Sequence, residues 1–72
     1  MPKFSEPRLR NRVREYRRLL SITQEELAAA AGITRIAVTR LDGNRTAMPS
    51  LPTALRLAAA LGISVKELVE DA

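Results

Sequence analysis

The sequence predicts a compact all-α domain of five helices, and three observations support this prediction. The chain has 72 residues, which suffices for one small domain and no second one. Hydrophobic residues make up 46% of the chain and aromatic residues only 3%, so we expect an aliphatic core rich in alanine and leucine. Apolar residues also recur at helical spacing in five segments, which are separated by capping residues and glycines. The domain is expected over residues 8–72.

The first helix is expected from about Arg8 to Leu20, after an N-terminal arm of residues 1–7. The arm lacks periodicity, and its two prolines disfavour a helix before the second of them. Within the helix, apolar residues repeat at spacings of four, three and four, which places them on one stripe. This stripe consists of Leu9, Val13, Tyr16 and Leu20.

Two short helices separated by a single glycine are expected between Gln24 and Gly43. Thr23 and Glu26 form a capping box that sets the start of the first of them. Gly32 occurs where that helix needs a left-handed residue to end. A helix that stops and restarts after about three residues leaves the pair roughly perpendicular, which is the geometry of a helix-turn-helix. The side chains expected to face the core are Leu27, Ala28 and Ala31 in one helix and Ile33, Val38 and Leu41 in the other.

The second helix of this pair can be oriented, because each residue advances about 100° around the axis. When Val38 and Leu41 face the core, the opposite side carries Arg35, Ile36, Thr39 and Arg40. In a helix-turn-helix this side enters the DNA major groove, where arginine reaches guanine edges and isoleucine suits a thymine methyl group. With the capping residue at the helix start, the candidate base-reading residues are Thr34, Arg35, Ile36, Thr39 and Arg40. The spacing alone fits a purely structural helical hairpin equally well.

Two further helices are expected in the C-terminal half. The preceding helix should end at Gly43 in left-handed geometry and lead into a loop up to Pro49. The fourth helix is then expected from Ser50 to Gly62, and a second capping box at Ser64 precedes a last helix over residues 65–70. The fourth helix should bury Leu51, Ala54, Leu55, Ala58 and Leu61.

The charge distribution is asymmetric along the chain. Residues 1–22 carry seven basic and two acidic side chains, whereas residues 23–45 are neutral and residues 46–72 carry one net negative charge. A surface that faces phosphates produces such a pattern, and so does a solvated arginine-rich helix face.

The composition argues against several classes of function. The chain has no cysteine and no histidine, which excludes disulfides and thiolate metal sites and removes the commonest general base. We therefore expect no metal, no cofactor and no catalytic residues. No apolar stretch is long enough for a membrane span, and no signal peptide is recognisable, so a cytoplasmic protein is expected.

From about Asn11 to Leu68 the chain resembles the Cro/lambda-repressor-type helix-turn-helix family of phage repressors and small bacterial regulators. The matching segments are RVREYRRLLSITQEELAAAAGI, TRIAVTRLDGNR, PSL and ALRLAAALGISVKEL. The resemblance implies a lambda-repressor-like fold. It also implies binding to specific sequences in double-stranded DNA as a repressor, with a homodimer on a palindromic operator.

The resemblance further implies roles for individual residues. Phosphate contacts are expected at Gln24 and in the loop at Asn44 and Arg45, while the position of Arg17 serves either structure or phosphate contact. Ile36 stands where many relatives have a polar residue, often glutamine, that reads adenine. The final helix often supplies the dimer contact in the family. This places the interface at Val65, Leu68 and Val69, unless all three side chains are internal.

A second class of function remains open, namely a module that binds a protein partner, such as an antitoxin. Such a module should expose several apolar side chains on the groove-facing side, where only Ile36 qualifies. A specialised DNA-binding role is also open, such as an antitoxin that represses its own operon or a controller of restriction-modification genes.

Overall fold

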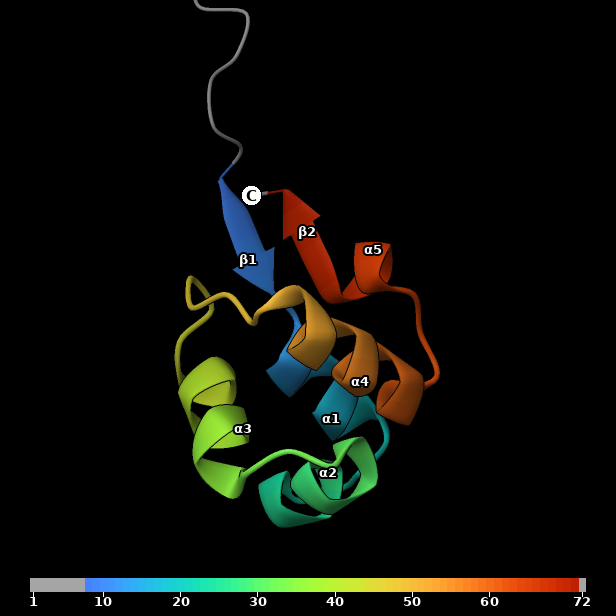
Figure 1. The fold of residues 1–72 in the computed structure, drawn as a ribbon. Helices are drawn as coiled ribbons and strands as arrows, with labels where there is room; N and C mark the ends of the chain where they lie inside the picture. Colours follow the sequence, from blue (N-terminus) through green and yellow to red (C-terminus); the bar gives the residue numbers. More distant parts are fainter. Residues whose placement is uncertain (1–7, 72) are drawn as a thin grey trace, which may run out of the picture.

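A computed structural model describes residues 8–71 as a bundle of five helices with a small sheet at one end (Figure 1). The elements in chain order are β1 (Leu9–Asn11), α1 (Val13–Leu19), α2 (Gln24–Ala31), α3 (Arg35–Gly43), α4 (Leu51–Leu61), α5 (Val65–Leu68) and β2 (Val69–Asp71). The predicted five-helix fold is confirmed, and the two-stranded sheet is a minor addition to it. The predicted arm, residues 1–7, lies outside the described residues.

The sheet joins the two ends of the described chain and corrects two predicted helix boundaries. β1 and β2 are antiparallel, with Asn11 opposite Val69 and Arg10 opposite Glu70. The first helix therefore begins at Val13 and not at Arg8, and the last helix ends before Val69. Helical periodicity is a local signal, and it was overridden here by pairing between segments about sixty residues apart.

The side chains at both ends of the predicted first stripe lie outside α1. Leu9 lies on β1 and is exposed, and Leu20 follows the end of α1 and is also exposed. Val13 is fully buried, and Tyr16 packs against the core. The stripe that closes the core from α1 is therefore shorter than the sequence pattern suggested.

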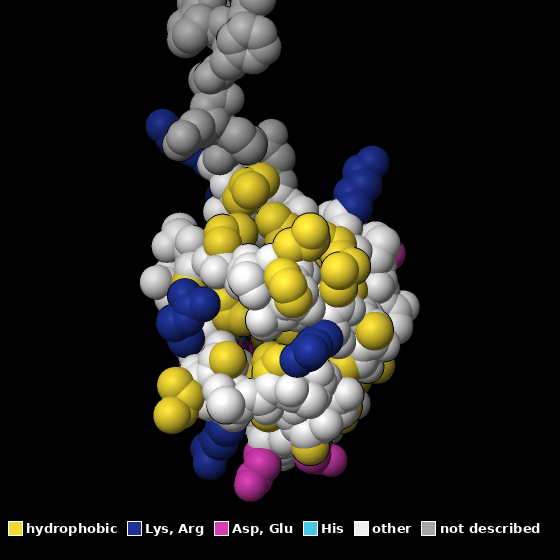
Figure 2. Space-filling view, in the orientation of Figure 1, with side chains coloured by type: hydrophobic (Ala, Val, Ile, Leu, Met, Phe, Trp, Pro, Cys, Tyr) yellow, Lys and Arg dark blue, Asp and Glu magenta, His cyan; other side chains and the backbone are white. Residues whose placement is uncertain are grey.

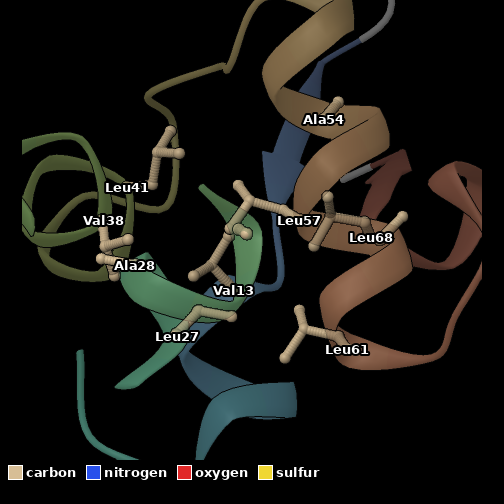
Figure 3. Packing of buried hydrophobic residues seen from close by; sticks show 11 residues of the cluster. Val13, Leu27, Ala28, Val38, Leu41, Ala54, Leu57, Leu61 and Leu68 are labelled. Carbon is tan, nitrogen blue, oxygen red and sulfur yellow. The ribbon is translucent and has the colours of Figure 1, made fainter. Parts of the chain in front are cut away.

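The core residues predicted for the helix-turn-helix are buried, except that Ile33 is only partly buried against the core. Figure 3 shows Leu57 and Leu61 of α4 pointing toward Val13 of α1 and Leu27 of α2. The complete buried cluster is Val13, Leu27, Ala28, Ala31, Val38, Leu41, Ala54, Leu57, Ala58, Leu61 and Leu68. This cluster holds α3 against the bundle with its opposite side facing outward.

The predicted inner face of α4 is partly wrong. Ala54, Ala58 and Leu61 are buried as expected, but Leu51 and Leu55 are 66% and 54% exposed. The buried stripe includes Leu57 in their place, since positions 54, 57, 58 and 61 fall within about 100° of one another around the helix. Leu55 falls outside this arc, and Leu51 lies in the first turn.

The helix ends agree with the capping signals except at one position. Thr23 and Glu26 form the predicted capping box, and Gly32 ends α2 with a left-handed φ of 67°. Gly43 is the last residue of α3, as predicted, but it has no positive φ, and the C-cap residue Asn44 follows in extended geometry with a φ of −142°. The expectation of a left-handed Gly43 is therefore wrong, because the loop leaves the helix in an extended direction.

Ser21, between α1 and α2, is the one non-glycine residue with positive φ in the described chain, at 56°. Its N–H donates to the carbonyl of Arg18 at 3.0 Å, which ends α1. Left-handed geometry costs an ordinary L-residue about 1–2 kcal/mol. The turn into the helix-turn-helix therefore carries local strain.

We predict that Ser21→Gly stabilises the domain. Glycine removes the left-handed penalty but adds roughly 0.5–1 kcal/mol of unfolded-state entropy. A net gain of about 0.5 kcal/mol and a Tm rise of about 2–4 °C are expected. Thermal unfolding followed by circular dichroism measures this gain.

The matched control is Ser50→Gly, which removes the N-cap side chain of α4 and should cost a few tenths of a kcal/mol. A Tm for Ser21→Gly that is equal to or below that of the unmodified protein would contradict the assignment of strain to this turn.

Candidate nucleic-acid interface

The outward side of α3 carries the four side chains that the helical period predicted for it. Arg35, Ile36, Thr39 and Arg40 are all exposed, and the exposed fraction of Ile36 reaches 81%. The hydroxyl of Thr34 accepts a hydrogen bond from the Ala37 N–H at 3.1 Å, which confirms the predicted cap and fixes the start of the helix. The predicted orientation of α3 is therefore confirmed.

Two of the candidate DNA-contacting residues touch each other across the helix-turn-helix. The hydroxyl of Thr39 donates a hydrogen bond to Oε1 of Gln24 at 2.7 Å. The amide nitrogen of Gln24 keeps its two N–H donors, and the hydroxyl oxygen of Thr39 keeps its lone pairs. The start of α2 is thus linked to the outward side of α3 while both side chains retain groups that suit a phosphate or a base edge.

A buried ion pair ties α3 to α1. Asp42 is 2% exposed, and the Nε and Nη2 of Arg17 donate to its two carboxylate oxygens at 2.5 and 3.4 Å. The Nε of Arg14 lies 3.4 Å from the same carboxylate. The hydrogen bond to Asp42 raises the pKa of Arg17, which also donates to the carbonyl of Ile22 at 2.9 Å. Arg17 was expected to serve either structure or phosphate contact, and these contacts are structural.

A second buried polar side chain fixes the loop after α3. The side-chain amide of Asn11 donates to the carbonyls of Asn44 at 2.9 Å and Ala47 at 2.7 Å, and its backbone N–H donates to the carbonyl of Arg45 at 2.8 Å. Its side-chain oxygen accepts from the Val13 N–H at 3.2 Å. β1 therefore holds the loop that carries two candidate phosphate contacts.

These two loop residues differ in how their side chains are used. The side-chain oxygen of Asn44 accepts from the N–H and the hydroxyl of Thr46, at 3.1 and 2.8 Å, and so shapes the turn. Arg45 is exposed and forms an ion pair with Glu15. Hydrogen bonds from Arg12, at 2.8 Å, and from Arg45 hold the pKa of Glu15 below its ordinary value, so this carboxylate is ionised at neutral pH.

Sequence reasoning missed Asn11 and Asp42. Asp42 did leave a signal, because an acidic residue in the last turn of a helix opposes the helix dipole and therefore points to a cationic partner elsewhere. Asn11 left none, since it lies in an arginine-rich stretch that gave no sign of burial. Both side chains are satisfied, as is every other buried side-chain nitrogen or oxygen among the described residues.

The predicted dimer surface is only partly accessible. Leu68 is 0% exposed and belongs to the core, so its assignment to an interface is corrected; Val65 and Val69 are half-buried against the same cluster. Figure 2 shows that hydrophobic side chains gather over α4, where Leu51 and Leu55 are exposed.

No helix between residues 8 and 71 is long and apolar enough to span a membrane. Over the same residues, no group of three or more acidic side chains is arranged to hold a metal ion.

Comparison with known proteins places this chain in a family. A family model described as helix-turn-helix matches residues 13–68, which covers most of the chain. An uncharacterised HTH-type transcriptional regulator from Methanothermobacter thermautotrophicus is 44% identical over 63 residues, which are 88% of this chain and 86% of the relative. The crystal structure of the restriction-modification controller protein C.AhdI from Aeromonas hydrophila matches with a TM-score of 0.71 and 37% identity. The match covers 79% of this chain and 85% of that one.

The fold and the exposed outward side of α3, the second helix of the helix-turn-helix, therefore define a helix-turn-helix DNA-binding protein. The chain belongs to the Cro/C1-type helix-turn-helix family, and the relatives reported above are a transcriptional regulator and a controller protein, not enzymes. The family expected from the sequence is confirmed.

We predict that Asp42→Asn destabilises the domain by about 2–3 kcal/mol, because it leaves the largely buried guanidinium of Arg17 without its counter-charge. The expected cost is below the full range for a buried pair, since the Arg17 side chain is 15% exposed. Urea unfolding at pH 7 measures the change in free energy.

Arg14→Gln is the control, because it removes the longer and half-exposed contact to the same carboxylate and should cost less than about 1 kcal/mol. If Asp42→Asn unfolded at the same urea concentration as the unmodified protein, the ion pair would not be a principal support of α3.

Proposed function

We propose that this protein is a transcriptional repressor that binds specific DNA sequences as a homodimer, on an approximately palindromic operator in the cytoplasm. The observation that carries the proposal is the outward side of α3, where exposed polar and apolar groups stand on a helix that is capped, packed and tied to α1. A rigid helix of this kind fits the major groove.

In this proposal the outward side of α3 reads base edges. Arg35 and Arg40 offer paired N–H donors to the O6 and N7 acceptors of guanine. Thr39 and the capping residue Thr34 offer hydroxyl groups. Ile36 offers only methyl and methylene groups, so it contacts a thymine methyl and excludes the bidentate adenine contact that glutamine makes.

The phosphate contacts lie on either side of α3. Gln24 presents its free amide N–H groups at the N-terminal end of α2, where the helix dipole also favours an anion. Asn44 and Arg45 lie in the loop that Asn11 holds, and Arg45 keeps several of its five N–H donors beyond its bond to Glu15. Arg17 serves this surface by positioning α1 against α3 through Asp42.

A homodimer would place two copies of α3 one helical turn apart on the same side of the duplex. The apolar surface for such an interface includes Val65 and Val69, which are half-buried in the single chain. Small domains bury a limited share of their surface, so an interface would also add stability.

A protein-binding module fits the outward side of α3 less well. Among the described residues, the exposed large hydrophobic side chains are Leu9, Leu19, Leu20, Ile36, Leu51 and Leu55. Only Ile36 of these lies on α3, and a single side chain does not form an apolar docking patch there.

Control of restriction-modification genes is a second candidate role. It is supported by the similarity to the controller protein from Aeromonas hydrophila, which extends over most of both chains. This role keeps the same DNA-binding surface and specifies the genes that it regulates.

We predict that Arg35→Ala and Arg45→Gln weaken DNA binding in different ways. Duplexes enriched from a random library by the unmodified protein supply the specific site. Arg35→Ala should cost about 1–3 kcal/mol on that site and relax the preference at one base pair, whereas Arg45→Gln should weaken binding to all duplexes and reduce the salt slope by about one.

Arg56→Gln, an exposed arginine on α4, is the matched control and should change neither property. Affinities are measured by fluorescence anisotropy at several salt concentrations. If Arg35→Ala left both affinity and base preference unchanged, α3 would not be the reading helix.

A further inference from the structure

A cavity of about 260 Å³ lies between α1 and the loop that follows α3. Arg12, Arg14 and Arg18 line it from the α1 side, and Arg45 lines it from the loop. The carboxylates of Glu15 and Asp42 also line it. The cavity is therefore strongly polar, and it adjoins the candidate phosphate contact at Arg45.

The carboxylates around this cavity are fewer than the arginines they neutralise. Asp42 is shared by Arg14 and Arg17, and Glu15 is shared by Arg12 and Arg45. A third carboxylate, that of Glu70, lies 3.7 Å from Arg12.

Arg18 has no ion-pair partner within residues 8–71. The cavity lining itself has four arginines and two carboxylates, which leaves a local excess of two positive charges.

This excess favours an anion with several oxygens. Each guanidinium presents five N–H donors in a planar fork, so arginines that already bind one carboxylate keep donors for a second acceptor. Phosphate offers more acceptor oxygens than a carboxylate and up to two negative charges, and arginine binds it in bidentate geometry. The cavity is smaller than the roughly 300–1,000 Å³ of sites for drug-sized ligands, which suits a single phosphate group.

We propose that this cavity is a binding site for a phosphate group, held by Arg14, Arg18 and Arg45. Two sources share this chemistry, namely a phosphate of the DNA backbone and a small phosphorylated molecule. Because Arg45 belongs to both the cavity and the proposed DNA surface, either occupant would couple the cavity to DNA binding. The site itself does not rest on the proposed function, since a phosphate titration needs no DNA.

The first experiment titrates the full chain with inorganic phosphate at pH 7.5, with ionic strength held constant by sodium chloride. Isothermal titration calorimetry gives the affinity, and the thermal midpoint is followed in parallel. Phosphate should bind with saturation and raise the Tm above the chloride control. Arg18→Gln should weaken phosphate binding about tenfold, because it removes a charge-assisted contact.

Two variants keep this test specific. Arg56→Gln carries the same charge change away from the cavity and should leave the phosphate affinity within about twofold. Arg18→Lys keeps the charge but loses the planar fork, so its phosphate affinity should fall between those of the unmodified protein and Arg18→Gln. Arg18 is exposed and outside the ion pairs of the described chain, so both changes at this position leave the fold intact.

The second experiment identifies the source by measuring duplex binding with the same variants. If a backbone phosphate enters the cavity, Arg18→Gln weakens DNA binding, lowers the salt slope by about one relative to Arg56→Gln, and phosphate competes with the duplex. If the occupant is a small molecule, Arg18→Gln weakens phosphate binding about tenfold and leaves the affinity for DNA unchanged.

The proposal is overturned if phosphate neither binds nor raises the Tm beyond the chloride control. It is also overturned if Arg18→Gln and Arg56→Gln lower the phosphate affinity equally. Failure of DNA binding alone would contradict the proposed function and leave a positive phosphate titration standing.

Discussion

The buried carboxylate of Asp42 is the contact on which the placement of α3 depends. Arg17 of α1 donates hydrogen bonds to both of its oxygens, and Arg14, one turn earlier in α1, forms a longer ion pair with it. An ion pair taken out of water gains little when both partners are present but costs several kcal/mol when one is removed. The outward direction of α3 therefore follows from this pair together with the apolar contacts of Val38 and Leu41 on the same helix.

Hydrogen bonds and an ion pair also hold the loop after α3 in place. Asn11 closes the loop after α3 with three hydrogen bonds to its backbone, and the β1–β2 pair anchors Asn11 in turn. Glu15 joins Arg12 to Arg45 on the surface. The candidate DNA-contacting groups thus stand on short elements whose positions are set by hydrogen bonds and ion pairs within the domain.

The sequence was sufficient for the features that local chemistry determines. The capping boxes, the left-handed Gly32 and the outward side of α3 follow from residue type and helical period. The strands, Asn11 and Asp42 do not, because their partners lie 25 to about sixty residues away and leave no periodic trace. The exposure of Leu51 and Leu55 was also missed. Helical spacing shows that an apolar residue lies on a given face of a helix, but it does not show how far the core extends over that face.

Fluorescence anisotropy of labelled duplex from the region upstream of its own gene tests whether this domain recognises a particular DNA sequence. A scrambled duplex of equal composition is compared at about physiological salt. Binding at least about a thousandfold tighter to the native duplex is predicted, which is the lower end for specific recognition. Equal, weak and salt-sensitive binding to both would contradict self-regulation, and the same result with duplexes enriched from a random library would contradict specific recognition altogether.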